Sequence, residues 1–258
     1  MNITTNTLFI GKVSKFVSDV DSTNSYANRL ISKSNPIEGT AIYTDFQSNG
    51  KGQIGSKWNS ASGQNILMSV ILKPVFLLPR EQFAINVAFS LAIVRALHKY
   101  LSNNNDLKIK WPNDIYYKDK KLGGILIENS ISSHSILFSV LGLGLNVNQT
   151  TFPSELPNPI SLQMIEGMPF ERDEIMANIL ENLETEYLKL KSNHQQSYNA
   201  YVDHLFGIGE DRKFRIIKNN EMFTGKIINV DAYGRLIIFD YSKARNRLFE
   251  FKEIEFVS

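Results

Sequence analysis

The stretch Lys110-Trp-Pro-Asn-Asp114 joins an apolar run that begins at Ile109 to a proline turn carrying a carboxamide and a carboxylate. We expect a strand over Ile109–Trp111. A lysine at the end of such a strand is costly unless an anion meets its ammonium group. Asn113 and Asp114 can simply cap the turn. The segment therefore indicates either an anion-binding lysine or a structural turn.

Two glycine-bearing segments follow, Lys121-Leu-Gly-Gly-Ile-Leu-Ile-Glu128 and Gly142-Leu-Gly-Leu-Asn146. Both are predicted to lie on neighbouring strands. A glycine in a strand leaves room for close approach by a ligand or by another part of the protein. Taken alone, each glycine pair is also explained by packing.

The segment Gly50-Lys-Gly-Gln-Ile-Gly55 matches G-x-G-x-x-G, but no helix is predicted after it, so a dinucleotide fingerprint is excluded. Val70-Ile-Leu-Lys73 resembles the kinase strand that carries a lysine, yet no H-R-D or D-F-G motif follows. The loop instead indicates backbone N–H groups near an anion, with positive charge from Lys51 and Lys57. A flexible hairpin with solvated lysines is the alternative.

Composition restricts the chemistry further. The 258 residues contain no cysteine, which excludes thiol nucleophiles and thiolate metal sites. The four histidines show no metal-binding spacing, so no protein-bound metal is predicted. A net charge of +2 without a basic block gives little support to nucleic-acid binding.

The sequence indicates neither export nor membrane insertion. The N-terminus lacks a basic segment followed by an apolar one, which a secretory signal requires. The longest apolar stretch, Phe83 to Leu97, is interrupted by Asn86, Ser90 and Arg95. We expect a cytoplasmic protein.

Periodicity predicts an α+β fold with a mixed sheet. Prolines between Pro153 and Pro169 indicate a loop without regular structure. The expected strands are Thr40–Phe46, Ile66–Leu72, Leu122–Ile127 and Ile136–Val147, and the expected helices are Arg80–Leu101, Glu171–Lys191 and Gln196–Phe206.

After Gly207 and Gly209 the pattern changes to short strands separated by turns at Asn219-Asn220 and Tyr233-Gly234. This spacing is typical of a small β-barrel-like domain. We therefore expect two domains, residues 1–206 and 207–258. The predicted strands of the second domain are Phe214–Ile217, Thr224–Asn229, Leu236–Phe239 and Leu248–Phe251.

In their order along the chain, these motifs closely resemble biotin protein ligase, over nearly the whole sequence. The resemblance implies a catalytic domain like that of class II aminoacyl-tRNA synthetases, a mixed β-sheet with helices packed on it, followed by an SH3-like β-barrel. The motifs are Ser22-Thr-Asn24, Gln47 with Gly50-Lys-Gly52, Lys110-Trp-Pro-Asn-Asp114, Lys121-Leu-Gly-Gly-Ile125, Gly142-x-Gly-x-Asn146 and Phe152-Pro-Ser-Glu-Leu156.

The resemblance implies an enzyme that joins biotin and ATP, with Mg²⁺, into biotinoyl-5′-AMP. The biotinoyl group then passes to one lysine of the biotin carboxyl carrier domain of a carboxylase. A monomer or a homodimer is compatible with this reaction. Some relatives carry an N-terminal winged helix-turn-helix, but Ser22-Thr-Asn24 arrives too early to leave room for one. We expect no DNA binding.

The resemblance also assigns roles to residues. Lys110 and Lys51 become electrostatic catalysts that stabilise charge on the biotin carboxylate and the α-phosphate. The implied biotin-binding residues are Ser22, Thr23, Asn24, Gln47, Lys51, Gly52, Gln53, Lys110, Gly123 and Gly124. The implied ATP-binding residues are Lys51, Gln53, Trp58, Lys110, Asn113, Lys121 and Asn146.

One departure concerns the loop, which commonly reads Gly-Arg-Gly-Arg in the family and reads Gly50-Lys-Gly-Gln53 here. An ammonium and a neutral amide replace two guanidinium groups, so retention of the adenylate is expected to differ. Three alternatives remain open: a lipoate or octanoate ligase of the same fold, a non-catalytic biotin or nucleotide sensor, and an interaction module.

Overall fold

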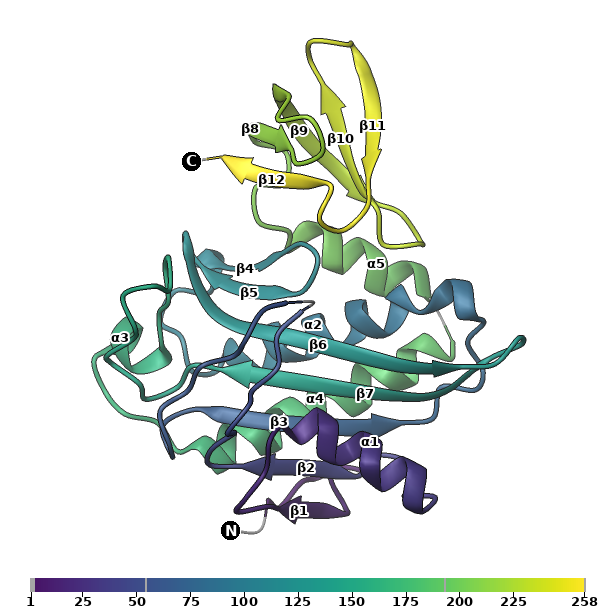
Figure 1. Ribbon diagram of the computed structural model, residues 1–258, viewed down its shortest axis with the longest axis vertical. Coiled ribbons are helices and arrows are strands. Elements are labelled where there is room, and N and C mark those ends of the chain that lie inside the picture. The colour runs from purple at the N-terminus through teal and green to yellow at the C-terminus, as the bar shows by residue number, and fades with distance from the viewer. Residues whose placement is uncertain (1–2, 54, 193, 258) are drawn as a thin grey trace.

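The computed structural model describes residues 3–53, 55–192 and 194–257 (Figure 1). Within these residues a seven-stranded sheet has the order β1-β2-β3-β7-β6-β5-β4. The β1–β2 pair is parallel and the other neighbours are antiparallel, so the predicted mixed sheet is confirmed. The strands are β1 (Ser14–Phe16), β2 (Ala41–Thr44), β3 (Ile66–Leu72), β4 (Leu107–Lys110), β5 (Asp114–Tyr117), β6 (Lys120–Ile131) and β7 (Ile136–Leu145).

Helices cover both faces of this sheet (Figure 1). Helix α1 (Thr23–Lys33) lies on one face, and α2 (Phe83–Leu97), α4 (Arg172–Leu190) and α5 (His194–Asp203) lie on the other. This double cover explains why β3 is buried at every residue and is apolar except for Ser69.

Helix α2 is shorter than the predicted 80–101. It is preceded by a 3₁₀ turn at Pro79–Glu81 and ends at Leu97, and another 3₁₀ turn at Asn104–Asp106 follows. All its residues except Phe83 and Arg95 are buried, because the helix packs against the sheet and against both α4 and α5. The predicted apolar stripe is therefore only part of its buried surface.

The expectation that the proline-rich stretch has no regular structure is wrong at one place. Helix α3 (Leu162–Glu166) forms between Pro159 and Pro169. Ser161 caps its start by accepting from the Met164 N–H, and Gly167 ends it in the left-handed conformation. The prolines stay outside the helix, so no backbone donor is lost within it.

The C-terminal region forms a second sheet, antiparallel throughout, at one end of the molecule (Figure 1). Its strand order is β11-β10-β9-β8-β12. The last strand was missed by the sequence analysis, and closure into a barrel stays a prediction. The strands are β8 (Asp211–Ile216), β9 (Met222–Val230), β10 (Leu236–Asp240), β11 (Arg245–Phe249) and β12 (Ile254–Val257).

This second sheet contacts the first part of the chain at the Lys110-Trp-Pro-Asn-Asp114 motif. The indole Nε1 of Trp111 donates to the carbonyl oxygen of Gly234 over 2.8 Å. The Trp111 ring also meets the Phe251 ring, with centroids 6.4 Å apart. These two contacts hold the Trp111 side chain in place. A domain boundary near residue 206 remains a prediction.

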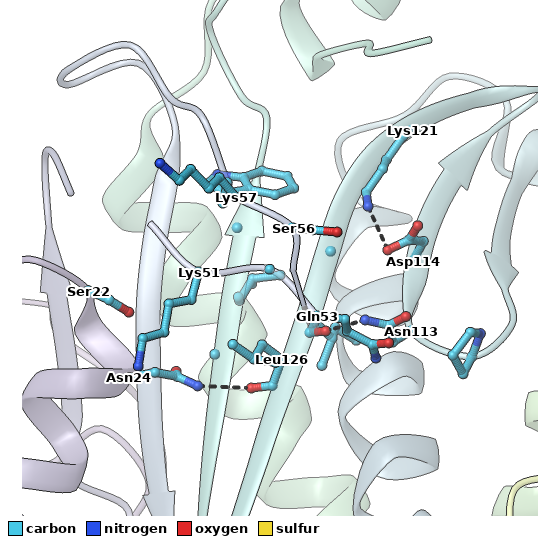
Figure 2. A pocket seen from close by; sticks show the side chains of 18 of the residues that line it. Ser22, Asn24, Lys51, Gln53, Ser56, Lys57, Asn113, Asp114, Lys121 and Leu126 are labelled. Atoms are coloured by element: carbon cyan, nitrogen blue, oxygen red, sulfur yellow. Dashed lines mark hydrogen bonds and ion pairs between the residues drawn. The ribbon is translucent and has the colours of Figure 1, made fainter. Parts of the chain in front are cut away.

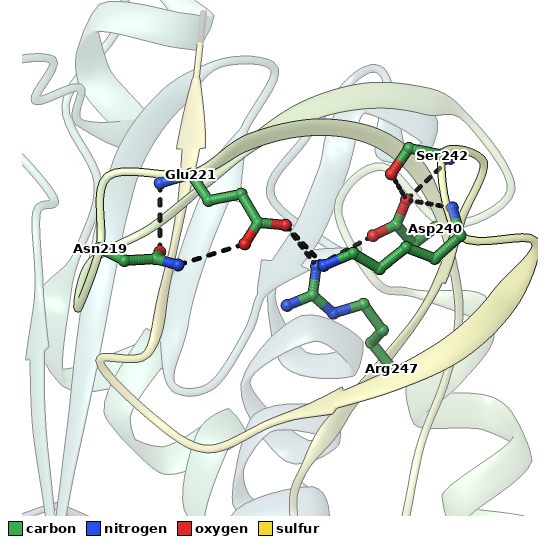
Figure 3. Close-up of polar contacts among 6 residues, drawn as sticks. Asn219, Glu221, Asp240, Ser242 and Arg247 are labelled. Atoms are coloured by element: carbon green, nitrogen blue, oxygen red, sulfur yellow. Dashed lines mark hydrogen bonds and ion pairs between the residues drawn. The ribbon is translucent and has the colours of Figure 1, made fainter.

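Asp240 is the buried charge of the second sheet (Figure 3). Its carboxylate accepts from the Ser242 N–H and hydroxyl at 2.8 and 2.6 Å, and from Arg247 Nη1 at 2.9 Å. Burial alone would raise the pKa of Asp240, but these bonds outweigh it and hold the pKa below its ordinary value. The ionised form therefore stabilises the fold.

We expect Asp240→Asn to lower the free energy of unfolding by about 2 kcal/mol at pH 7, because Arg247 loses its buried partner. A depressed folded-state pKa contributes stability above the unfolded pKa of about 3.9 and loses it as pH falls further. Urea unfolding from pH 7 to pH 3 measures both effects. The variant should lose less stability on acidification than the wild type. Glu221→Gln, at the less buried end of the same cluster, should show a smaller effect of the same kind, because its hydrogen bond with Lys243 also lowers the pKa of Glu221.

None of the helices in the described ranges has both the length and the apolar character needed to cross a bilayer.

Candidate active site

One pocket collects nearly all the residues singled out by sequence (Figure 2). It lies between the start of α1, the loop before β3, and strands β5, β6 and β7, and Phe251 of the C-terminal region lines it too. The predicted site residues in its lining are Ser22, Thr23, Asn24, Gln47, Lys51, Gly52, Gln53, Trp58, Lys110, Asn113, Lys121 and Gly124.

Ser22 occupies the N-cap position of α1, but its side chain makes no capping bond. It is buried, and its hydroxyl points into the pocket (Figure 2). The first turn of the helix is instead held by Gln47, whose Oε1 accepts from the Thr23 N–H at 2.8 Å. Within the described residues the Ser22 hydroxyl makes no hydrogen bond, so it is available to a ligand that enters the pocket.

The two polar atoms of the Gln47 side-chain amide have different surroundings. Its Oε1 lies against Thr23, within 2.8 Å of the N–H and 3.2 Å of the hydroxyl oxygen. None of the described contacts uses its Nε2 group. The amide is thus fixed by the backbone of α1, with a donor left for a ligand.

The glycine loop is a hairpin that closes over this end of the pocket. Its backbone bonds run from the Trp58 N–H to the Gly50 carbonyl and from the Gly52 N–H to the Ser56 carbonyl, at 3.0 and 2.9 Å. The backbones of Lys51 and Lys57 pair in an isolated antiparallel β-bridge, and both residues line the pocket. Two cations therefore border the same cavity, as the anion-loop interpretation requires. Ile54 lies outside the described residues.

Gln53 and Trp58 carry polar atoms without partners. Within the described residues, Oε1 of Gln53 and Nε1 of Trp58 are buried and make no hydrogen bond. Such groups are costly in a protein interior. Both residues line the pocket, so a polar ligand that reaches them would relieve the cost.

Lys110 ends β4 among aromatic rings. Its Nζ lies 4.6 Å from the ring centroid of Tyr116 and 5.3 Å from that of Phe256, and 3.3 Å from the Tyr116 hydroxyl. Within the described chain no carboxylate comes within 4.0 Å of it. Burial is the main reason why the pKa of Lys110 is lowered, and Arg212 adds to the shift. This cation is ready for an anionic ligand.

Lys121 and Asp114 form an ion pair at one side of the pocket (Figure 2). The Lys121 Nζ lies 2.8 Å from Oδ1 of Asp114, and 5.9 Å from the Trp58 ring centroid. Asp114 begins β5, a strand the sequence analysis missed because a polar turn was expected there. Asn113 is buried, and its Nδ2 donates to the Ile125 carbonyl, so it ties the turn to β6.

Two predicted residues lie outside the pocket lining. Gly123 is the neighbour of Gly124 on β6 and therefore faces the opposite side of the sheet, where an added Cβ would meet the Leu145 side chain at 3.1 Å. Asn146 is buried beyond the end of β7, and its Nδ2 donates to the Ile160 carbonyl at 3.0 Å. Their positions suit packing and loop anchoring.

Gly144 and Gly142 give the pocket its floor. A Cβ on Gly144 would lie 2.3 Å from Cε2 of Trp58, and one on Gly142 would lie 2.3 Å from Oδ1 of Asn24. The close approach inferred for this glycine pair is therefore made by protein side chains. Only glycine admits them there.

Several residues of the site were missed by sequence reasoning. Ser69 of β3 lies under the start of α1, and Asn86 and Tyr201 both donate to the Pro112 carbonyl, at 2.7 and 3.2 Å. Phe251 and Phe256 come from the C-terminal region. The sequence does show a serine, an asparagine and a tyrosine within otherwise apolar helices and strands. The residues next to them in the sequence do not indicate that they lie near the pocket.

For metal binding, no group of three or more His, Cys, Asp or Glu side chains in residues 3–53, 55–192 and 194–257 is placed to hold an ion.

Comparison with known proteins identifies the class. Residues 16–146 match the Biotin/lipoate A/B protein ligase family, and the chain belongs to this family. The resemblance drawn from the ordered motifs is thereby confirmed.

Individual relatives and solved structures give a more specific comparison than the family does. The bifunctional ligase/repressor BirA of Bacillus spizizenii is 30% identical over 223 residues, which are 85% of this chain and 67% of the relative. The biotin–[acetyl-CoA-carboxylase] ligase of Mycobacterium tuberculosis is 25% identical over 224 residues, 86% of this chain and 81% of the relative. The biotin protein ligase from Aquifex aeolicus, solved with biotin and ATP, has a TM-score of 0.76 at 24% identity and covers 95% of this chain and 99% of its own. Its likeness confirms the fold.

Proposed function

We propose that this protein is an ATP-dependent biotin protein ligase. The supporting observation is that motifs from five separate parts of the sequence line one pocket, with Lys110 and Lys51 among them. The relative from Mycobacterium tuberculosis is named for the same reaction. In this proposal the end of the pocket lined by Ser22 and Gln47 binds the ureido ring of biotin. The end lined by Lys110 binds the biotin carboxylate and the nucleotide.

The first step forms a bond between a biotin carboxylate oxygen and the α-phosphorus of ATP, and the bond to the β-phosphate breaks. Pyrophosphate leaves with the bonding electrons. Two anions must approach one another, so fixed cations stabilise the charge that spreads over the phosphoryl oxygens. Lys110 suits this role because it is half-buried and lacks a carboxylate partner in the described chain.

In the second step the amine of a carrier lysine attacks the carbonyl carbon of biotinoyl-5′-AMP. The new amide forms as the bond to the phosphate oxygen breaks, AMP leaves, and the amine releases a proton. We propose a biotin carboxyl carrier domain as the acceptor, in the cytoplasm. The protein's own side chains bind and orient the adenylate in both steps.

Mg²⁺ enters this proposal together with ATP. The pocket supplies Asp114, whose carboxylate is engaged by Lys121. A single engaged carboxylate fits a magnesium ion carried mainly by the nucleotide phosphates and water. The ion would screen the phosphate charge during the approach of the biotin carboxylate.

The test is pyrophosphate release from Mg²⁺-ATP with biotin, lipoate, octanoate or no acid. We expect release with biotin alone. Release with lipoate or octanoate alone would assign the protein to the other branch of the family, and no release with any acid would indicate a sensor. Biotin-dependent release followed by labelling of a carrier domain would establish both steps.

Gln53→Arg is expected to slow release of the adenylate about tenfold. Gln53 lines the pocket and its buried Oε1 has no partner in the described residues. A guanidinium group at this position can donate two hydrogen bonds to a phosphate, whereas the amide can donate only from its NH₂. Stopped-flow displacement of preformed biotinoyl-5′-AMP measures the rate. Gln53→Lys, which adds charge without a planar fork, separates charge from geometry, and an unchanged rate in the arginine variant would contradict the idea.

A further inference from the structure

The carbonyl oxygen of Pro112 is held by two helices behind the sheet. It accepts a hydrogen bond from Nδ2 of Asn86 on α2 at 2.7 Å and another from the hydroxyl of Tyr201 on α5 at 3.2 Å. A carbonyl oxygen has two lone pairs, so these two donors fix its direction. Both side chains are buried, and burial raises the pKa of Tyr201, so its hydroxyl keeps the proton that it donates.

The peptide group between Pro112 and Asn113 is trans, so its N–H points opposite to its carbonyl group. The Pro112 carbonyl faces α2 and α5, and the Asn113 N–H therefore faces the other side of the sheet. Helix α1 and the glycine loop lie on that side, and the pocket lies between them and the sheet (Figure 1). Asn113 lines this pocket, so a ligand bound there can reach its N–H.

Within the described residues the Asn113 N–H has no partner. The Asn113 side chain donates to the Ile125 carbonyl, and the Asn113 carbonyl accepts from the Ile125 N–H at 2.9 Å, but no described hydrogen bond uses the Asn113 N–H. Asn113 is only 9% exposed, and a buried N–H without a partner is rare in folded proteins. This donor therefore calls for an acceptor that the protein itself does not supply.

The charges around this N–H suit an anionic acceptor. Lys110, in the same turn, has no carboxylate within 4.0 Å in the described chain. The carboxylate of Asp114 is engaged by Lys121 at 2.8 Å, so its negative charge is compensated. The turn thus offers one cation and one neutral donor to the same cavity.

We propose that the Asn113 backbone N–H is an anion-binding donor of the active site, and that Tyr201 and Asn86 are the positioning residues that direct it. The inference rests on the proposed function and assigns this N–H to the biotin carboxylate oxygen that does not attack ATP. That oxygen becomes the carbonyl oxygen of biotinoyl-5′-AMP. It gains negative charge again when the carrier amine adds to the carbonyl carbon, and a donor that is already in place stabilises this charge.

The test compares the dissociation constants of biotin and of biotinol, the alcohol in which a CH₂OH group replaces the carboxylate. Calorimetry on the full chain without ATP measures both. The ureido ring is the same in the two ligands, so the ratio of the constants reports on the carboxylate end alone. The wild type should bind biotin about 100-fold more tightly than biotinol.

Tyr201→Phe and Asn86→Leu should each lower this ratio about threefold, and the double variant should lower it about tenfold. Each substitution removes one donor from the Pro112 carbonyl. The peptide group can then turn, and the Asn113 N–H turns with it. The two donors come from different helices, so either single variant decides the question if the other does not fold.

Tyr198→Phe is the matched control. Tyr198 also lies on α5 and meets the same Phe83 ring, with centroids 6.3 Å apart against 5.6 Å for Tyr201. Its hydroxyl also donates to a backbone carbonyl, that of Ala232 at 3.2 Å. This variant loses a comparable hydrogen bond outside the turn, so the ratio should equal that of the wild type.

A merely structural role of Tyr201 and Asn86 would weaken both ligands by the same factor and leave the ratio unchanged. That result, or a wild type that binds biotin and biotinol equally well, overturns this inference and leaves the proposed function standing. A wild type that binds neither ligand overturns the proposed function together with it.

Discussion

Lys110→Met is expected to reduce biotin-dependent pyrophosphate release by a factor of about 10²–10³. The substitution keeps an unbranched apolar side chain among the rings of Tyr116 and Phe256 and removes only the charge. That charge is the proposed stabiliser of the phosphoryl oxygens. Single-turnover formation of biotinoyl-5′-AMP at saturating ATP measures the loss on the chemical step.

The same variant should be as stable as the wild type or more stable. Burial lowers the folded-state pKa of Lys110 below its ordinary value of 10.5, so the charged lysine opposes folding at every pH below the lowered pKa. Methionine removes this cost. Lys108→Met, two positions earlier on β4 and outside the pocket lining, is the matched control and should keep full activity. Loss of folding together with activity in Lys110→Met would make Lys110 a structural residue.

The sequence was informative wherever a single segment carried its own signal. The strand Ile66–Leu72 matches β3 at both ends, because Asn65 precedes it and Lys73-Pro74 follows it. The helices α2 and α4 follow their apolar periodicity. On its own residues Lys110-Trp-Pro-Asn-Asp114 indicated either an anion-binding lysine or a structural turn, and its assignment to the site came from the order of the motifs, which resembles the family.

The site residues that the sequence did not predict depend on which strands become neighbours in the sheet. Ser69, Gly142 and Leu126 form one row across β3, β7 and β6, and no local pattern sets this register. Only the folded sheet shows that the space left by Gly142 is filled by Asn24. The orientation of Gly123 away from the pocket depends on the same alternation along β6.

The C-terminal contribution was missed for a similar reason. Phe256 lies beside Lys110, although 146 positions separate them in the sequence, and the Trp111 indole donates to Gly234. An aromatic residue in a short strand indicates that the strand packs into a small core. It does not indicate a contact with a lysine far away in the sequence. The second sheet therefore completes the surroundings of the motif, and its separation at residue 207 would expose them.

Gly144→Ala should lower adenylate formation about 100-fold, because a misplacement of about 1 Å in a site can cost that much. The added methyl group would lie 2.3 Å from Cε2 and 2.7 Å from Nε1 of Trp58, closer than any real contact. The indole ring must leave the floor of the pocket. Because Trp58 closes the glycine-loop hairpin through its N–H bond to Gly50, the loop that carries Lys51 must shift with it.

Gly124→Ala is the matched control, since Gly124 faces Gly144 across β6 and β7 and borders the same ring. Its added methyl group would lie 3.3 Å from Cζ3 of Trp58, a distance that a small adjustment of the ring can accommodate. Because Gly124 lines the pocket as well, we expect a smaller loss in Gly124→Ala than in Gly144→Ala, with both proteins unfolding near the wild-type temperature. Equal activities of the two variants would mean that the position of the Trp58 ring is unimportant for the reaction, and the pocket floor would then have to be assigned to other side chains.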